Sequence, residues 1–318
     1  MQTHFENKVT ETYDRALRRG ELYFVKSTIV NVTENDIEFE IRFAPSLAKR
    51  PTAEQTDENH MKHKVDPFAP YNQDLFVQEY GNHIVLLNKF CVVPNHLLVV
   101  TKEFEEQTDS LNQEDLAALW YCMMQFKNQQ IIAFYNCGNH SGSSQPHKHM
   151  QVVPLPSDDR FTPPINAIIY KYQNKKPGEI FNFQELPYFH YVTLLDPQQL
   201  CGHHGHSHKE TVSQYLTENY LALIDAMVEG MRASPLTEGF HPLSYNFLIT
   251  HTWMMVVPRL SEKYEQISVN SLGFAGMLLV KNEEELDFVK NVGILRILEG
   301  VAISKDKDQL IGGVHISV

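Results

Sequence analysis

Two apolar, β-branched runs flank a turn of small residues near the middle of the chain. The first run, Ile131–Tyr135, leads into the turn, and the second, His147–Leu155, leaves it. Runs of this length and composition are typical of strands, and the glycine and serine residues between them favour a reversal of the chain. The sequence therefore predicts a strand–turn–strand unit, which requires a sheet at the centre of the fold.

The second run carries an unusual pattern of polar residues. If Lys148–Val153 is a strand, successive side chains point to opposite faces. One face then carries three polar groups, namely His147, His149 and Gln151. The other face carries Lys148, Met150 and Val152. Two imidazoles and an amide on one surface suggest chemistry, although a lone histidine on an apolar strand is more often a hydrogen-bonded core residue.

The turn before this strand predicts an anion site. Gly142, Ser143 and Ser144 can present main-chain N–H groups and two hydroxyls to anionic oxygens. A neutral imidazole that faces a bound phosphate can attack it and form a phosphoramidate, which passes the phosphoryl group to a second acceptor. The plainer interpretation is that the three residues form only a flexible turn.

The remaining pattern predicts an α/β (α+β) fold with a mainly antiparallel sheet flanked by helices. The expected helices are Phe5–Arg19, a helix after a Ser110/Gln113 capping box that runs to about Asn128, Glu210–Arg232 and Glu283–Leu298. The expected strands are a hairpin over Ser27–Phe43, then Asn82–Phe90, His96–Thr101, Tyr245–Thr250, Trp253–Val257 and Leu272–Val280. We expect a loop over 51–64 and an insertion over the sheet at 157–209.

Composition limits the class of protein. The chain has 318 residues, 42% of them hydrophobic, and a formal net charge of -12. The negative charge argues against nucleic acid as a partner, because that binding needs a basic surface. No segment reaches the ~20 apolar residues of a membrane span, and no signal peptide is apparent. Four widely spaced cysteines indicate reduced, mostly buried thiols, so we expect a cytoplasmic protein with no membrane partner.

The segment H-K-H-M-Q after G-S-S-Q resembles the H-x-H-x-Q signature of nucleotidyltransferases in the histidine-triad (HIT-like) superfamily. Within it, the chain is most similar to the diadenosine tetraphosphate phosphorylases, also called ATP adenylyltransferases. The resemblance continues through P-S-L-A-K at 45–49, L-L-N-K-F at 86–90, N-H-L-L-V-V-T-K-E-F at 95–104, F-Y-N at 134–136, the run at 244–259, and N-S-L-G-F-A-G-M-L-L-V-K at 270–281. The resemblance implies a single HIT-like nucleotidyltransferase domain over 1–318, with the segment 210–318 completing the active site.

The resemblance also implies roles for individual residues. His149 matches the family's nucleophile. Gln151 offers a neutral amide that can donate to a phosphate oxygen in the transition state. His147 is a supporting residue that either orients the turn or contacts the substrate, and the plainer alternative is a structural hydrogen bond. The residues that match substrate-binding positions are Lys49, Asn88, Lys89, Asn136, Gly142, Ser143, Ser144, Gln145, Asn270, Ser271, Leu272, Met277 and Lys281. Outside that context, a surface lysine is usually only solvated and a strand-end asparagine is a common turn former.

The implied reaction is reversible phosphorolysis of diadenosine tetraphosphate. An adenylyl-histidine forms as ATP leaves, and inorganic phosphate then releases ADP. The expected partners are these small molecules, accompanied by a divalent cation, Mg or Mn, that shields the polyphosphate. No organic cofactor is expected.

Three alternatives stay open from the sequence. A hexose-1-phosphate uridylyltransferase would share the histidine chemistry, a histidine-triad hydrolase would use water as acceptor, and a nucleotide sensor would bind without turnover. The cluster at His203–His208 invites a zinc site, but adjacent histidines in a Gly and Ser loop rarely converge on one ion, so we expect no metal site. Phe183, Tyr188 and Phe189 either stack on adenine or anchor the insertion.

Overall fold

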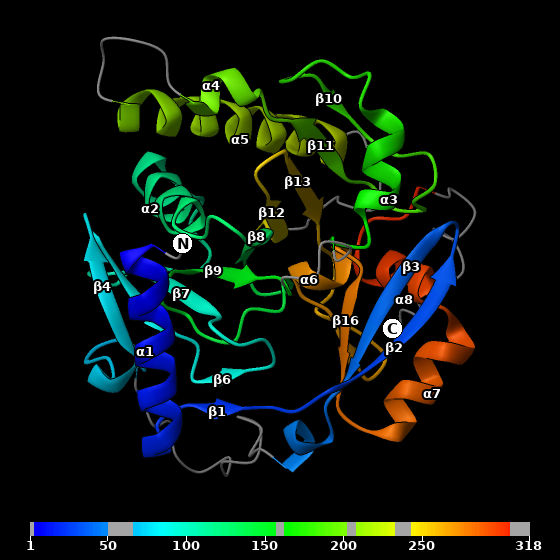
Figure 1. Cartoon of the computed structure of the whole chain (residues 1–318). Helices are drawn as coiled ribbons and strands as arrows, with labels where there is room; N and C mark the ends of the chain where they lie inside the picture. Colours follow the sequence, from blue (N-terminus) through cyan, green and yellow to red (C-terminus); the bar gives the residue numbers. More distant parts are fainter. Residues whose placement is uncertain (1–2, 50–65, 157–161, 202–207, 233–242, 306–318) are drawn as a thin grey trace, which may run out of the picture.

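The computed structural model describes residues 3–49, 66–156, 162–201, 208–232 and 243–305 (Figure 1). Its centre is a nine-stranded sheet in the order β10-β11-β13-β12-β8-β9-β7-β5-β4. Each neighbouring pair in it is antiparallel, which confirms the predicted sheet type. The strands are β4 (Phe76–Tyr80), β5 (His83–Leu87), β7 (Leu97–Thr101), β8 (Ile131–Cys137), β9 (His149–Pro154), β10 (Ile180–Phe181), β11 (Tyr191–Leu194), β12 (Tyr245–Ile249) and β13 (Trp253–Pro258).

A second, three-stranded sheet joins the two ends of the chain. Strands β2 (Thr28–Glu34) and β3 (Ile37–Phe43) form the predicted hairpin, and β16 (Met277–Val280) lies parallel to β3. Two small pairs complete the strands: β1 (Tyr23–Phe24) with β6 (Phe90–Cys91), and β14 (Lys263–Tyr264) with β15 (Ile267–Ser268). The segment at 270–281 is thereby held on the same body as the N-terminal hairpin.

Helices and the small sheet cover the two faces of the large sheet (Figure 1). One hydrophobic core joins one face to α1 (His4–Arg19), α2 (Gln113–Met124) and α5 (His208–Arg232). The other core joins the opposite face to β3 and to α3 (Asn166–Ile169), α6 (Ser271–Phe274), α7 (Glu283–Val292) and α8 (Ile294–Val301). The short elements η1 (Pro45–Lys49), η3 (Gln73–Leu75), η4 (Tyr170–Tyr172) and α4 (Pro197–Cys201) lie in the connections.

Strands β8 and β9 divide their side chains between these two cores. Met150 and Val152 belong to the core under α2, whereas Val153 belongs to the other. The predicted alternation is therefore confirmed within β9, which begins at His149 rather than at His147. His149 and Gln151 point to the same side as Val153, toward the face that carries β3, α3 and α6.

Three predicted helix and strand boundaries are wrong. Helix α2 starts two residues later than expected, with a capping box between Asn112 and Asp115, and it ends at Met124. The expected strand over 272–280 is instead α6 followed by β16, because Asn270 caps a helical turn before the strand begins. The expected helix over 283–298 is divided into α7 and α8 at Gly293, which adopts φ 92°.

The segment at 157–209 differs from the expectation of an insertion over the sheet. Its described part supplies β10 and β11, which extend the large sheet beyond β13. Phe183 and Tyr188 are fully buried and Phe189 packs against the core, so these aromatic side chains anchor the segment. The expected loop over 51–64 and the histidines at 203–207 lie outside the described residues, as does the side chain of His208.

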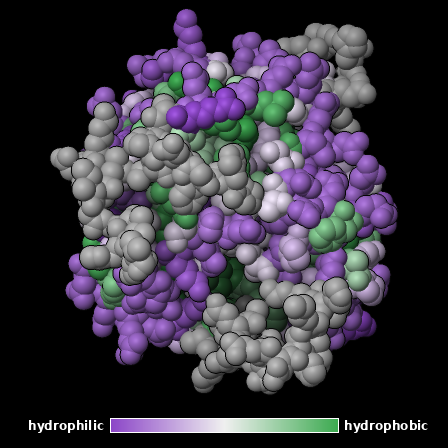
Figure 2. All heavy atoms as spheres, turned by 180° about the vertical axis from the view of Figure 1, so that it is seen from behind, coloured by the Kyte–Doolittle hydropathy of each residue, from purple (hydrophilic) through white to green (hydrophobic). Residues whose placement is uncertain are grey.

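The surface of the protein agrees with a chain that buries most of its hydrophobic side chains in a core. The rear face is largely hydrophilic, with hydrophobic atoms visible mainly in small patches and in hollows (Figure 2). Among the described residues, no helix is both long enough and apolar enough to cross a membrane. All four cysteines are free thiols, and three of them, Cys91, Cys122 and Cys137, are buried as expected.

Candidate active site

The imidazole of His149 is held as a neutral base. The residue is 4% exposed, and its Nδ1–H donates to the His147 carbonyl at 2.8 Å. Burial lowers the pKa of the His149 imidazole to about 4, so the ring is neutral at pH 7. Since Nδ1 carries the proton, Nε2 keeps its lone pair. A nitrogen in this state can act as a nucleophile.

A cavity of about 290 Å³ lies beside this ring. Six of the residues predicted from the sequence line it: Asn88, Lys89, Ser144, Gln145, His149 and Gln151. Its remaining lining is mostly apolar and includes Phe68, Leu75, Leu86, Leu98 and Phe90. A cavity with an apolar wall, a lysine and several amides suits a ligand that combines a planar base with phosphate groups.

A chain of hydrogen bonds orients the amide of Gln151. Asn88 Nδ2 donates to His96 Nδ1 at 3.3 Å, and His96 Nε2 donates to Gln151 Oε1 at 2.9 Å. Burial lowers the pKa of His96 to about 4, so its ring is neutral and can accept at one nitrogen while it donates at the other. The Gln151 oxygen is thereby occupied, and its NH₂ group is the end available to a phosphate oxygen.

His147 does not line this cavity. Its Nε2 lies 2.9 Å from the Thr101 carbonyl, and its Nδ1 lies 2.7 Å from Oδ2 of Asp66. The ring is 1% exposed and packs against Phe68. These contacts fix the His147 main chain, whose carbonyl accepts the hydrogen bond from Nδ1 of His149. This arrangement suits a supporting role for His147.

The predicted anion turn packs directly on the C-terminal segment. Gly142 adopts φ 82°, and a Cβ placed there would lie 2.6 Å from the Val269 carbonyl oxygen. Ser143 Oγ donates to the Gln145 carbonyl at 3.1 Å, which closes the turn. Only glycine fits at position 142, because both the dihedral angle and the space exclude a side chain.

A second cavity, of about 100 Å³, collects other predicted residues on the far side of this turn. Gly142 lines it together with Asn270, Met277 and Lys281. Lys281 comes from the end of β16, and Asn270 caps α6. Residues of the one turn at 142–145 therefore line both cavities.

Asn136 and Ser271 lie in a buried hydrogen-bond network. Asn136 Oδ1 accepts from Asn246 Nδ2 at 2.8 Å and from Ser271 Oγ at 2.7 Å. Arg259 is 1% exposed, donates to Asn246 Oδ1, and donates to the Val269 carbonyl at 2.9 Å. This network fixes β8, β12 and the start of α6 against one another.

Two predicted residues are less directly placed. Leu272 is half-buried in α6, where its amide donates to Asn270 Oδ1 at 3.0 Å. Lys49 ends η1, and its side chain lies outside the described part of the chain. The structure therefore brings together the residues of 88–89, 142–151 and 270–281, and leaves the role of Lys49 as a prediction.

Models of known families match most of this chain. The Ap4A phosphorylase N-terminal domain matches residues 1–171, and the ATP adenylyltransferase C-terminal domain matches residues 184–304. The chain belongs to the Ap4A phosphorylase family. The two matched regions leave residues 172–183 between them, a stretch that includes β10, and strands of both regions form one sheet.

Two yeast proteins and a yeast crystal structure resemble this chain over most of its length. Diadenosine 5',5'''-P1,P4-tetraphosphate phosphorylase 2 of Saccharomyces cerevisiae is 30% identical, with 90% of each chain covered. Protein APA1 of the same yeast is 28% identical over 87% of this chain and 86% of its own. The crystal structure of yeast Ap4A phosphorylase Apa2 in complex with Ap4A matches with a TM-score of 0.76 and 26% identity, covering 96% of this chain and 99% of that chain.

The sequence reasoning did not identify two residues that hold groups of the site in place. His96 orients Gln151, and Gln107 binds the main chain of His149, with the His149 amide donating to Gln107 Oε1 at 2.8 Å. Each is an isolated polar residue in or beside a loop, with no spacing that marks it. The only sequence signal was their position inside or next to the run N-H-L-L-V-V-T-K-E-F at 95–104.

Proposed function

We propose that this protein catalyses the phosphorolysis of diadenosine tetraphosphate to ATP and ADP, through an adenylyl group bound to His149. The observation that carries the proposal is the neutral His149 ring, fixed at Nδ1 and bordering a cavity with Lys89 and Gln151. The yeast Ap4A phosphorylase Apa2, whose crystal structures include complexes with Ap4A and AMP, resembles the chain over nearly all of its length.

In the first step, the Nε2 lone pair of His149 attacks the α-phosphorus. The bond from phosphorus to the bridging oxygen breaks, and ATP leaves with that oxygen and its electron pair. The ring becomes cationic in the adduct, and the His147 carbonyl, which accepts from Nδ1 at 2.8 Å, stabilises that charge. Gln151 donates to a non-bridging oxygen as negative charge develops there.

In the second step, inorganic phosphate replaces the imidazole. A phosphate oxygen attacks the same phosphorus, the N–P bond breaks, and its electron pair returns to Nε2, which regenerates neutral His149 and releases ADP. Lys89 and the turn at 142–145 supply the positive charge and the N–H groups that hold the anionic groups during both steps.

We also propose that the substrate enters as a complex with Mg²⁺ or Mn²⁺. The chain carries a formal net charge of -12, and a tetraphosphate is itself strongly anionic, so charge repulsion opposes binding. A divalent cation bound to the polyphosphate would offset this repulsion and would stabilise the negative charge of ATP as it leaves. A cytoplasmic location is proposed as well, since buried free thiols are typical of a reducing compartment.

The experiment incubates the protein with diadenosine tetraphosphate and Mg²⁺, with and without inorganic phosphate. We expect ATP and ADP in equal amounts, and only with phosphate present. ATP and AMP would indicate a hydrolase, and tight binding without turnover would indicate a sensor; either result contradicts the proposal.

The intermediate gives a second test. In rapidly quenched protein without phosphate, mass spectrometry is expected to find AMP on the peptide that contains His149. The variant His149→Ala is expected to lose more than about 10³-fold in rate, since covalent catalysis is removed. A loss below about tenfold would contradict the assignment of the nucleophile.

A further inference from the structure

The main chain of His149 is held by a side chain that belongs to neither cavity wall described above. Gln107 is 5% exposed and lies between β7 and α2. The His149 N–H donates to Gln107 Oε1 at 2.8 Å, and Gln107 Nε2 donates to the His149 carbonyl at 3.3 Å. One amide therefore binds both main-chain polar groups of the proposed nucleophile.

Gln107 occupies the point where β8 and β9 separate. Their pairing starts at Ile131 with Pro154 and stops at Phe134 with Gln151. Continuing the antiparallel register would place Asn136 opposite His149. Instead, Gln107 Nε2 donates to the Asn136 carbonyl at 2.8 Å. The Gln107 amide thus makes the hydrogen bonds to Asn136 and His149 that the two strands would otherwise make to each other. The strands can then separate into the turn at 138–146.

The main chain of Gln107 is bound to both ends of this turn. Its N–H donates to the Pro146 carbonyl at 2.7 Å, and its carbonyl accepts from the Gly138 N–H at 3.1 Å. The Tyr135 hydroxyl donates to the same carbonyl at 2.9 Å. The position of Gln107 is consequently set by the segments that it separates.

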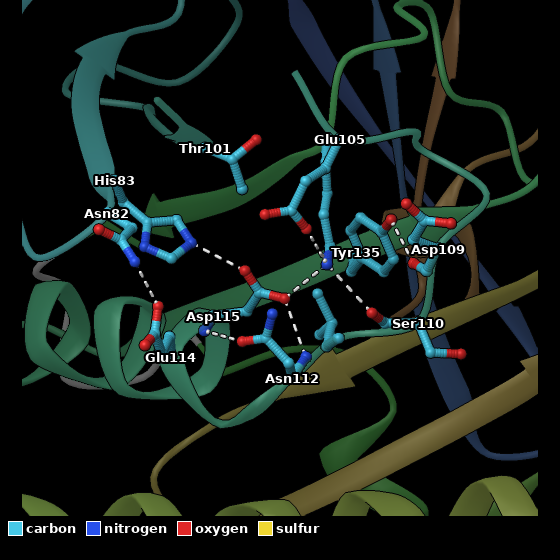
Figure 3. Close-up of polar contacts among 12 residues, drawn as sticks. Asn82, His83, Thr101, Glu105, Asp109, Ser110, Asn112, Glu114, Asp115 and Tyr135 are labelled. Carbon is cyan, nitrogen blue, oxygen red and sulfur yellow. Dashed lines mark hydrogen bonds and ion pairs between the residues drawn. The ribbon is translucent and has the colours of Figure 1, made fainter. Parts of the chain in front are cut away.

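Lys148, which precedes His149 and points to the opposite face, also binds the loop that contains Gln107. Its Nζ donates to Oε2 of Glu105 and to the Ser110 carbonyl, both at 3.0 Å, and lies 2.7 Å from Oδ2 of Asp115. Figure 3 shows Asp115 held on its other oxygen by His83. Lys148 is 1% exposed, so these bonds lie in the interior of the protein. What the lysine adds is directed bonds to both ends of the loop at 105–110.

We propose that Gln107 is a positioning residue for the reaction, which sets the direction of the His149 imidazole by fixing the main chain at the end of β9. The inference rests on the proposed function in one respect, that His149 is the nucleophile. Because the ring is bonded to the His147 carbonyl, its direction follows the main chain of 147–149. A displacement of about 1 Å at a reacting atom lowers a rate by about 10²-fold.

The test replaces Gln107 by a side chain of similar length that makes no hydrogen bond. Gln107→Met is expected to lower kcat at least about tenfold while KM changes by less than about threefold, since the proposed substrate contacts are kept. Rates are normalised to the folded fraction from circular dichroism. The control is Gln78→Met, which removes a side-chain amide that donates to the Tyr121 hydroxyl at 3.2 Å on β4, outside the two cavities described above. It is expected to keep the wild-type kcat.

A second measurement does not depend on turnover. Nitrogen-15 NMR of the histidine rings, assigned with His149→Ala, is expected to show the Nδ1–H tautomer for His149 in the wild type and a changed signal in Gln107→Met. Should Gln107→Met not fold, Gln107→Glu serves instead, because it keeps the acceptor for the His149 N–H and loses the donor to both carbonyls.

The outcomes separate the two proposals. If the wild type converts no dinucleotide, the proposed function fails, and the ring signal alone decides on Gln107. A changed His149 signal supports positioning by Gln107. A variant with the wild-type His149 signal and the kcat of Gln78→Met overturns it.

Discussion

His96 donates from Nε2 to Oε1 of Gln151 at 2.9 Å, and this bond decides which end of the Gln151 amide is available to a ligand. The direction is fixed because Asn88 Nδ2 donates to the other nitrogen of the same ring at 3.3 Å. A buried neutral imidazole between two amides thus keeps the NH₂ group of Gln151 toward the cavity. The proposed phosphate donor depends on a residue that does not itself line the cavity.

Removing this orientation is expected to slow the reaction. In His96→Phe the ring is retained but the donor is lost, so the Gln151 amide can rotate. We expect kcat to fall by about 10-fold to 10²-fold. Complete loss of one transition-state donor lowers kcat by about 10²–10³-fold, which sets the upper limit. Gln151→Met measures that upper limit. The double variant should be no slower than Gln151→Met, and an additive loss would show that His96 acts by another route.

The activity should depend weakly on pH around neutrality. Burial lowers the pKa of His149 to about 4, and only the neutral ring attacks phosphorus. We therefore expect kcat/KM to stay level from about pH 8 to pH 6 and to fall as the pH approaches 4, because protonation removes the lone pair. A stopped assay over this range checks it. A decline centred near the ordinary histidine pKa of about 6.5 would contradict a buried, neutral nucleophile.

Stability should fall over the same acid range. Burial lowers the pKa of His96 and His149 to about 4 and that of His190 to about 3. Between these values and about 6.5 the unfolded chain binds more protons than the folded one, so the free energy of unfolding rises with pH there. The stabilisation is complete above about pH 6.5 and is lost toward pH 4. Urea unfolding at pH 7, 6 and 5 should show the decrease, and a flat or opposite trend would contradict the burial of these rings.

The ion pair of Lys148 and Asp115 allows a double-mutant test. Burial raises the pKa of Asp115, but hydrogen bonds from His83 and Lys148 outweigh it and hold the pKa below its usual range. Lys148→Met should cost about 3–5 kcal/mol of unfolding free energy, because it leaves a buried carboxylate without its cation. Lys148→Met combined with Asp115→Asn should cost less than the sum of the two single changes. Additive costs would show that the pair is not coupled.

Much of the fold could be predicted from local pattern. The hairpin over 27–43 follows from alternation around a turn, and the pair of β12 and β13 follows from two strand-like runs around the turn at His251; both are confirmed. The division of α7 from α8 has one local signal, Gly293, but the start of α8 is capped by Glu34, whose carboxylate accepts from the N–H groups of Ile294 and Leu295 at 2.7 and 3.0 Å. A cap that comes from 260 residues away leaves no local signal.

The candidate site shows the same division. The strand pattern of His149 and Gln151 and the small turn at 142–144 pointed to phosphate chemistry, and in the structure Ser144 of that turn lines the same cavity as His149 and Gln151. Gln107 was invisible to that reasoning, because its importance comes from the separation of β8 and β9, a tertiary feature. Local sequence reports which side chains alternate along a strand, whereas it does not report where two strands part.

Gly142 gives the last prediction. Its φ is 82°, and a Cβ added to it would lie only 2.6 Å from the Val269 carbonyl oxygen, so Gly142→Ala must displace either the turn or the start of α6. The added strain should cost about 1–3 kcal/mol, and KM for the dinucleotide should rise if the turn contacts its phosphates, as we propose. Gly178→Ala is the matched control: it has the same φ of 82°, and the contact nearest to its added carbon is 3.9 Å away. It should lose stability from the dihedral angle alone, without the added contact, while KM stays unchanged. Equal KM values for the two variants would separate the Gly142 turn from substrate binding.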